Sequence, residues 1–134
     1  MPSYEVGETF ELDRGPVTTV QLVMYAGASG DFNRIHYDLP FAQEAGLGGV
    51  IAHGMLTMGF AGQLLTNWAG PRAFVKAISA RFVSSVRPGD TVRLRGTVTA
   101  IEPVAGASIV SVDFTGAVQD REVISGAAKM AFPA

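Results

Sequence analysis

Two short segments hold most of the side chains in this sequence that could carry out chemistry. SGDFNRIHYD at positions 29–38 contains Asp31 and His36, and IAHGMLTMG at positions 51–59 contains His53. A carboxylate and an imidazole on one loop can take a proton from a bound water and return it, because both groups can be tuned toward neutrality. The spacing alone equally fits a structural Asp–His hydrogen bond or a capping role for Asp31.

Two helices should position this loop. Residues 15–31 predict a helix that starts at a Thr18 cap and ends at glycines, and DLPFAQEAG at 38–46 predicts a short helix capped by Asp38 and closed by Gly46. Residues 54–68, directly after His53, predict a helix of about four turns. That helix is apolar on nearly every side, so we expect it to be buried.

A sheet should cover that helix. GETFELD near the start has strand character, and four further strand-like runs follow, at about residues 73–85, 90–102, 107–119 and 122–132. Hairpin-length links between them predict antiparallel pairing. The expected fold class is therefore α+β, an antiparallel sheet wrapped around the apolar helix, with Gly59 and Gly62 allowing close approach to the sheet. The run 73–85 is apolar on both faces, which predicts cover by a second subunit.

Size and composition narrow the classes further. With 134 residues and no cysteine, the chain predicts one domain spanning 1–134 without disulfides or thiolate sites. MPSYEVGETF lacks the regions of a secretory signal, so a cytoplasmic location is expected. Residues 45–71 are uncharged, but glycines and a proline divide them, so no membrane span is expected. A net charge of −2 and 9% aromatic residues do not favour a nucleic-acid partner.

One stretch is locally basic. This stretch could bind the phosphate groups of a ligand, or it could be an ordinary solvated strand face. Its six bases, with Asp90 as the one acid among them, are Arg72, Lys76, Arg81, Arg87, Arg93 and Arg95.

The two chemical segments together resemble the MaoC-like (R)-specific enoyl-thioester hydratases and 3-hydroxyacyl-thioester dehydratases. The family pattern is a Gly-Asp-x-Asn-Pro-Ile-His run, an alanine-glycine turn and an Ala-His-Gly-Met helix start. The matching residues here are Gly30, Asp31, Asn33, Ile35, His36, Ala45, Gly46, Ala52, His53, Gly54 and Met55. The resemblance implies the hot-dog fold, and IAHGMLTMG looks especially similar to the B-subunit type of the mycobacterial (3R)-hydroxyacyl-ACP dehydratase.

The resemblance also implies roles for these residues. Hydration of an enoyl thioester needs a group that takes a proton from water, a proton for C2 and a stabiliser for the enolate-like oxygen. Asp31 and His36 are the expected catalytic pair, and the Gly54 N–H at the helix start is the expected oxyanion donor. We expect Asn33 to form a turn contact and His53 to support the site by anchoring the helix start. Which member of the pair moves which proton stays open.

The expected substrate is an acyl thioester of CoA or of acyl carrier protein, whose phosphates could meet the basic stretch. No metal and no separate cofactor are expected, because no phosphate-binding glycine motif follows a strand and two histidines do not complete a ligand set. The expected assembly is a homodimer, or a heterodimer with a related hot-dog subunit.

Two positions depart from the family pattern. Arg34 replaces the usual proline and is expected to loosen the loop, and Gly59 stands where several short-chain hydratases have a serine. The alternatives to a hydratase are a hot-dog thioesterase, a subunit active only with a partner, and a pure acyl-binding protein.

Overall fold

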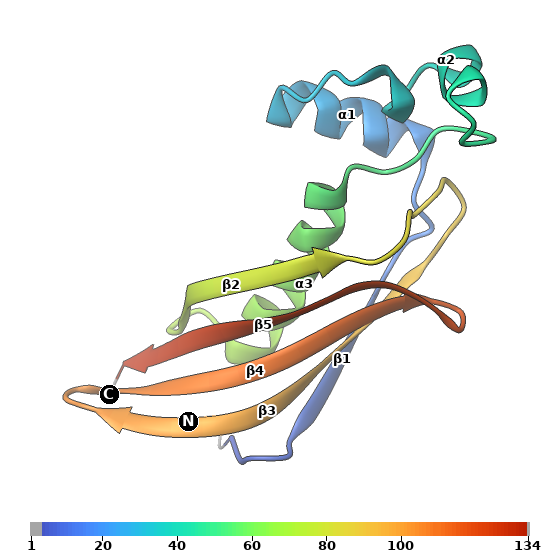
Figure 1. Ribbon diagram of the computed structural model, residues 1–134. Coiled ribbons are helices and arrows are strands. Elements are labelled where there is room, and N and C mark those ends of the chain that lie inside the picture. Colours follow the sequence, from blue (N-terminus) through green and yellow to red (C-terminus); the bar gives the residue numbers. More distant parts are fainter. Residues whose placement is uncertain (1–3, 134) are drawn as a thin grey trace.

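The computed structural model describes residues 4–133, so Met1–Ser3 of the opening segment and Ala134 lie outside the described part of the chain. A five-stranded antiparallel sheet of order β1-β3-β4-β5-β2 curves around one helix, α3, as Figure 1 shows. The strands are β1 (Thr9–Arg14), β2 (Phe74–Phe82), β3 (Val92–Val104), β4 (Ala107–Val118) and β5 (Arg121–Pro133). The predicted α+β class is confirmed.

Apolar and charged residues alternate along the first half of β3. Val92, Leu94 and Val98 are buried, whereas Arg93 and Arg95 between them are exposed. Side chains of a strand point alternately to opposite faces, so this pattern puts the apolar set against the core. The alternation ends after Val98, where the register between β3 and β4 shifts.

The strand order differs from a simple chain of hairpins. The β3–β4 and β4–β5 links are hairpins, but β2 pairs with β5 at the far edge of the sheet. Residues 87–90 form a turn, with Asp90 N–H donating to the Arg87 carbonyl at 3.0 Å. It belongs to a longer connection between two strands that are not neighbours. The predicted strand 73–85 therefore ends at Phe82, and residues 83–86 form a loop near the start of α3.

Helix α3 (Gly54–Ala69) buries much of its surface, as expected, but one face is open to solvent. The buried residues of the helix are Thr57, Phe60, Ala61, Leu64, Leu65 and Ala69. Met55 on the open face is 57% exposed. Gly59 and Gly62 do not bring the helix close to the sheet, since a Cβ at each position would meet nothing within 4 Å.

The opposite end of α3 is held by an aromatic contact to β1. Trp68 Nε1–H donates to the Glu8 carboxylate at 2.7 Å, and the Trp68 ring stacks on Phe10 with centroids 4.2 Å apart. α3 is the longest described helix at 16 residues, and no described helix is long and apolar enough to cross a membrane.

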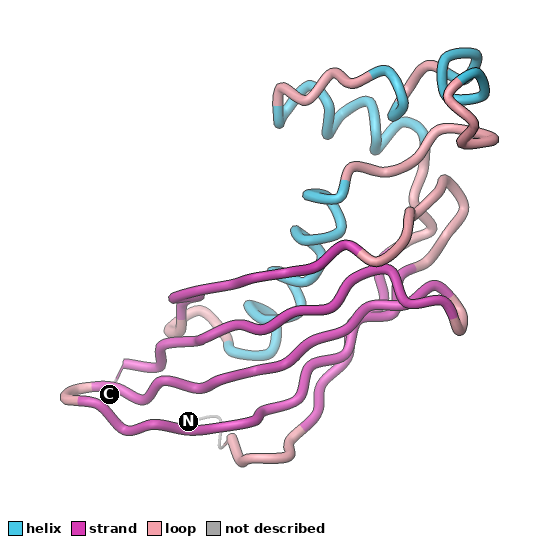
Figure 2. Tube along the Cα trace, in the orientation of Figure 1, coloured by secondary structure: helices cyan, strands magenta, loops and turns pink. Residues whose placement is uncertain are grey.

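Two further helices and a short 3-10 turn form a lobe above the start of α3, as the tube in Figure 2 shows. α1 (Thr19–Ser29) begins at Thr18, whose hydroxyl accepts the Gln21 N–H, as predicted. α2 (Leu39–Glu44) begins at Asp38, whose carboxylate accepts the Phe41 N–H, and it is followed by Gly46 with a positive φ of 83°. The 3-10 turn η1 (Arg34–His36) interrupts what the sequence predicted to be a plain loop.

Candidate active site

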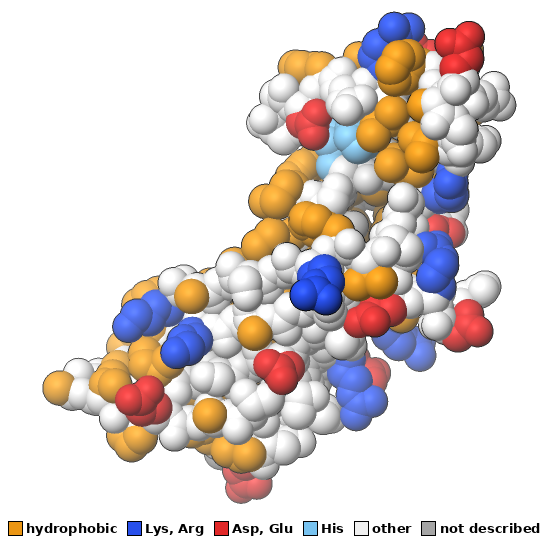
Figure 3. Space-filling view, viewed as in Figure 1, with side chains coloured by type: hydrophobic (Ala, Val, Ile, Leu, Met, Phe, Trp, Pro, Cys, Tyr) orange, Lys and Arg blue, Asp and Glu red, His pale blue; other side chains and the backbone are white. Residues whose placement is uncertain are grey.

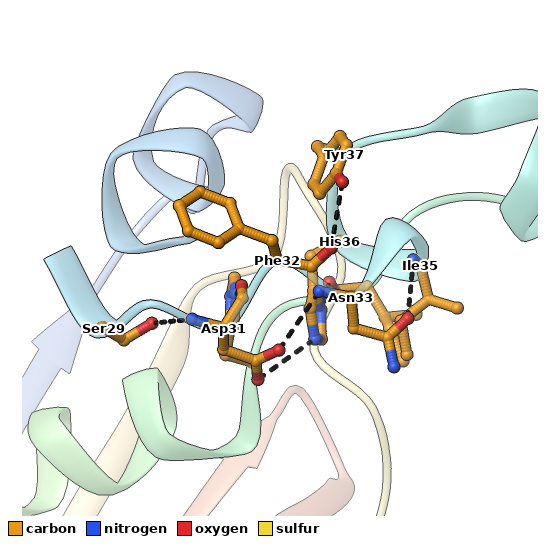
Figure 4. A network of polar contacts seen from close by, with 9 residues as sticks. Ser29, Asp31, Phe32, Asn33, Ile35, His36 and Tyr37 are labelled. Atoms are coloured by element: carbon orange, nitrogen blue, oxygen red, sulfur yellow. Dashed lines mark hydrogen bonds and ion pairs between the residues drawn. The ribbon is translucent and has the colours of Figure 1, made fainter. Parts of the chain in front are cut away.

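The Asp31 carboxylate is set by the end of α1. Gly30 caps the helix in the left-handed conformation, with φ of 77°, and turns the chain away from the helix axis. Asp31 N–H then donates to Ser29 Oγ at 3.2 Å, and Asp31 Oδ1 accepts the Asn33 N–H at 3.2 Å (Figure 4). Asp31 Oδ2 is not used in these hydrogen bonds, and the Asp31 side chain is 55% exposed.

His36 faces this carboxylate from the end of η1. Asn33 starts that turn by accepting the Ile35 N–H with its side-chain oxygen at 3.2 Å, which agrees with the turn contact expected for Asn33. His36 Nδ1 lies 2.8 Å from the Ile51 carbonyl oxygen, and a carbonyl only accepts, so Nδ1 carries a hydrogen. Nε2 is thereby turned toward Asp31 Oδ2, which is 3.9 Å away. The structure thus brings together the two predicted catalytic side chains, one exposed and one buried.

His53 is the N-cap residue of α3, and its ring lies against this pair. Its side chain makes no capping hydrogen bond to α3. Its Nε2 instead lies 3.1 Å from the main-chain oxygen of Asp31. Its ring stacks on His36 with centroids 3.6 Å apart. The centroid of the Tyr25 ring lies 4.8 Å from the centroid of the His53 ring.

The start of α3 provides main-chain donors beside His36. In the described residues, the N–H groups of Gly54 and Met55 have no hydrogen-bond acceptor, as is usual for the first turn of a helix. A Cβ at Gly54 would lie 3.2 Å from the Phe82 ring, so glycine at this position lets Phe82 pack over the helix start. The sequence did not indicate that packing of Phe82 requires a glycine at position 54.

A cavity of about 400 Å³ connects His36 with the start of α3. The residues that line it come from η1, the segment before α3, α3 itself, the 82–86 segment and β5: His36, Ile51, Ala52, Gly54, Thr57, Phe82, Val83, Ser84, Ser85, Val86 and Val123. The space-filling view shows histidine atoms in the notch under the helical lobe, beside hydrophobic side chains (Figure 3). This site combines the His36 imidazole, the N–H groups at the start of α3 and apolar side chains. Such a combination suits a ligand that has a polar carbonyl group and a hydrocarbon chain.

Comparison with known protein families identifies the family of this chain. Residues 3–120 match the family model described as the MaoC like domain. The chain belongs to the MaoC-like domain family. It is 35% identical over 119 residues to the (R)-specific enoyl-CoA hydratase of Rhodospirillum rubrum, covering 88% of this chain and 81% of that protein. It is 32% identical over 130 residues to the 3-hydroxybutyryl-CoA dehydratase of Methylorubrum extorquens, covering 96% and 81%. These relatives are hydro-lyases.

Solved structures with the hot-dog fold resemble this MaoC-like domain, and two of them come from complexes of two subunits. A chain in the ChsH1–ChsH2 complex of Mycobacterium tuberculosis superposes with a TM-score of 0.86 at 25% identity, covering 97% of this chain and 99% of that one. The HadBC (3R-hydroxyacyl-ACP dehydratase) complex of the same organism gives a TM-score of 0.81, covering 98% and 99%. Identity to the latter is 14%, so that likeness shows the fold alone.

Arg34, which departs from the MaoC-like pattern, does not loosen the loop as expected. Its guanidinium donates to Asp38 Oδ2 through Nε at 3.0 Å and Nη2 at 2.8 Å, and it lies over the Phe41 ring at 4.5 Å. These contacts join η1 to α2. The hydrogen bond from Arg34, together with that from the Phe41 N–H, lowers the pKa of the Asp38 carboxyl.

Asp31, His36 and His53 also form a cluster whose potential ligand atoms lie within 4.8 Å of one another. The sequence did not predict this proximity. The imidazole lone pairs lie in the ring planes, and the two rings are stacked with 20° between the planes. Two stacked rings direct these lone pairs side by side rather than toward a common ion. The arrangement therefore fits a metal site poorly.

The basic stretch does not form a single patch. Lys76 and Arg81 lie on β2, whereas Arg93 and Arg95 lie on β3, and β4 and β5 separate these strands. Arg93 donates to Asp13 of β1 at 3.1 Å, an interaction that raises the Arg93 pKa. At least part of this stretch is thus engaged in the sheet rather than available for phosphates.

Sequence reasoning missed three residues near the site. Tyr25 reaches His53 from α1, and Phe82 and Thr57 line the cavity. No local pattern indicates Tyr25 or Phe82, because their contacts join segments about 28 positions apart in the chain. A second cavity of about 400 Å³ lies at the opposite end of α3, around Ala69 and Phe132, and contains none of the predicted site residues.

Proposed function

We propose that this chain interconverts trans-2-enoyl and (3R)-hydroxyacyl thioesters, with Asp31 and His36 as the acid–base pair. The observation that carries the proposal is the approach of Asp31 Oδ2 to His36 Nε2 at 3.9 Å, because His36 also lines a cavity that reaches the start of α3. One water oxygen at about 2.8 Å from each atom fits this separation. The stereochemical part of the proposal rests on the name of the R. rubrum relative.

The geometry suggests how hydration would proceed. The pair takes one proton from the bound water as its oxygen adds to C3, and a proton is delivered to C2. Negative charge that develops on the thioester oxygen is stabilised by the Gly54 N–H at the positive end of α3. Dehydration follows the same path in reverse, with the 3-hydroxyl leaving as water.

We further propose that the chain works with a second hot-dog subunit, either a copy of itself or a related chain. β2 is an edge strand, and the exposed residues Phe74, Phe82 and Val83 lie on it or just after it. An unpaired apolar edge favours association. The similar chain of the ChsH1–ChsH2 complex belongs to a two-subunit assembly, which supports the same expectation.

The deciding experiment incubates the purified chain with crotonyl-CoA and longer enoyl-CoAs while the loss of enoyl absorbance is followed. Chiral chromatography should identify the 3R alcohol as the product. Release of free thiol without hydration would instead indicate a thioesterase. Turnover that appears only after a related subunit is added would indicate an obligate partner, and the same assay with acyl-ACP distinguishes the two carriers.

A further inference from the structure

His53 contacts both members of the Asp31–His36 pair, through two different parts of its ring. Its Nε2 lies 3.1 Å from the main-chain oxygen of Asp31, and its face stacks on the His36 ring with centroids 3.6 Å apart and 20° between planes. The side chain is almost fully enclosed, since His53 is 2% exposed.

The hydrogen-bond acceptors determine where each ring carries its hydrogen. Both acceptors, the main-chain oxygens of Asp31 and Ile51, can only accept, so His53 donates from Nε2 and His36 donates from Nδ1. The two stacked rings therefore hold opposite tautomers. His53 Nδ1 is buried and has no partner among the described residues, so a hydrogen there would be an unsatisfied buried donor.

The bond from His53 is also the only described hydrogen bond that ties Asp31 to a residue outside its own loop. The others join Asp31 to Ser29 and to Asn33, each two positions away. Such local bonds shape the turn but do not fix its position relative to α3. His53 immediately precedes α3, and the bond to Asp31 spans 22 positions.

We propose that His53 is a positioning residue for the acid–base reaction, a statement that rests on the proposed function. Its Nε2–H holds the main chain of Asp31, and its ring face holds the imidazole of His36. Together the two contacts maintain the separation of 3.9 Å between Asp31 Oδ2 and His36 Nε2. His53 itself is not among the residues that line the cavity, and it reaches the cavity only through its contact with the lining residue His36.

The first test is independent of turnover. The chain has two histidines, so a ¹⁵N-histidine spectrum contains only two rings, and His53→Phe assigns them by removing one. At mildly alkaline pH, we expect an Nδ1–H tautomer for His36 and an Nε2–H tautomer for His53. The same tautomer on both rings, or Nδ1–H on His53, would overturn the proposal.

The second test separates the two contacts. His53→Phe keeps a ring against His36 but removes the donor to Asp31, and His53→Gln keeps an N–H near the position of Nε2 but removes the ring. We expect each to lower kcat by about 3-fold to 30-fold and His53→Ala to lower it by about 100-fold, with KM within about threefold, because small misplacements of reacting groups reduce turnover steeply. Val98→Ala, a buried change in β3, is the control: it should lower the thermal midpoint and leave kcat within about twofold.

The outcomes separate this proposal from the proposed function. If folded His53→Ala keeps wild-type kcat, or changes KM alone, His53 does not position the pair, although the hydratase assignment stands. If the wild type hydrates no enoyl thioester, the proposed function fails, and the positioning role in that reaction fails with it. The tautomer spectrum then still reports whether the two stacked rings are held as described.

Discussion

The carboxylate of Asp31 and the imidazole of His36 approach to 3.9 Å from opposite environments, since the Asp31 side chain is 55% exposed and that of His36 is 8% exposed. The carboxylate thus stays in reach of solvent water, while the imidazole is held rigidly by the Ile51 carbonyl. This contrast suits a pair that must collect a water molecule from solvent and orient it.

Replacement of either member of the pair should abolish most of the turnover. Asp31→Asn retains an oxygen for the Asn33 N–H but removes the proton acceptor, and we expect kcat to fall by about 10²–10⁴. His36→Ala should cost a similar factor. The double variant should be little worse than either single one, because residues that act as a unit are not additive. Near-wild-type kcat for folded Asp31→Asn would place the acid–base chemistry elsewhere.

The start of α3 should tolerate no side chain at position 54. Gly54→Ala places a Cβ about 3.2 Å from Phe82, and it also narrows the approach to the Gly54 N–H, so kcat/KM should fall at least tenfold. Adding Phe82→Leu relieves the crowding. If activity then returns fully, crowding rather than loss of carbonyl access explains the defect.

A matched glycine on the open face of α3 provides the control. Gly59→Ala meets nothing within 4 Å, and alanine favours a helix over glycine by about 0.5–1 kcal/mol. Denaturant unfolding should show a gain in stability of about that size. A clear loss would mean that another chain packs against this face in solution.

The free edge of β2 should mediate association. Phe74 is 56% exposed and Phe82 is 47% exposed, and both flank the unpaired edge, so the chain should sediment as a dimer at micromolar concentration. Phe74→Glu and Phe82→Glu should shift it toward monomer, whereas Val104→Glu on β3 should not. A wild-type monomer that is fully active would contradict the need for a second subunit.

The contact between Arg34 and Asp38 should contribute stability in a pH-dependent manner. The pKa of Asp38 is lowered in the folded state, chiefly by the hydrogen bond from Arg34, so its ionised form stabilises the fold above the unfolded pKa of about 3.9. This contribution disappears as pH falls through the lower folded pKa. Asp38→Asn retains a helix cap but not the charge, so its thermal midpoint should lie below that of wild type near pH 6 and converge with it at strongly acidic pH. A constant difference across this range would contradict the assignment.

Chelation should not affect the reaction. The Asp31, His36 and His53 side chains cluster, but the two stacked rings do not direct their lone pairs toward one point. Dialysis against EDTA should leave kcat unchanged, and added zinc should not raise it. A loss of turnover that zinc restores would show that the rings rearrange to bind an ion.

The sequence by itself determined the local elements and pointed to the two side chains that we propose as the acid–base pair. Side-chain alternation located β3, the Thr18 and Asp38 caps located the starts of two helices, and the spacing of Asp31 and His36 nominated the pair. These features depend on residues within a few positions of one another, so a short stretch of sequence is enough to predict them.

The tertiary structure alone decided the strand order, the exposed face of α3 and the contacts of His53. β2 lies beside β5 rather than β3, and that placement brings Phe82 over Gly54. His53 meets Asp31 across 22 positions, and no periodicity or cap rule encodes such a contact. Contacts of this kind depend on how separate elements pack against one another. Many alternative pairings of apolar faces would bury similar surface, and only the complete set of contacts makes one pairing the most stable.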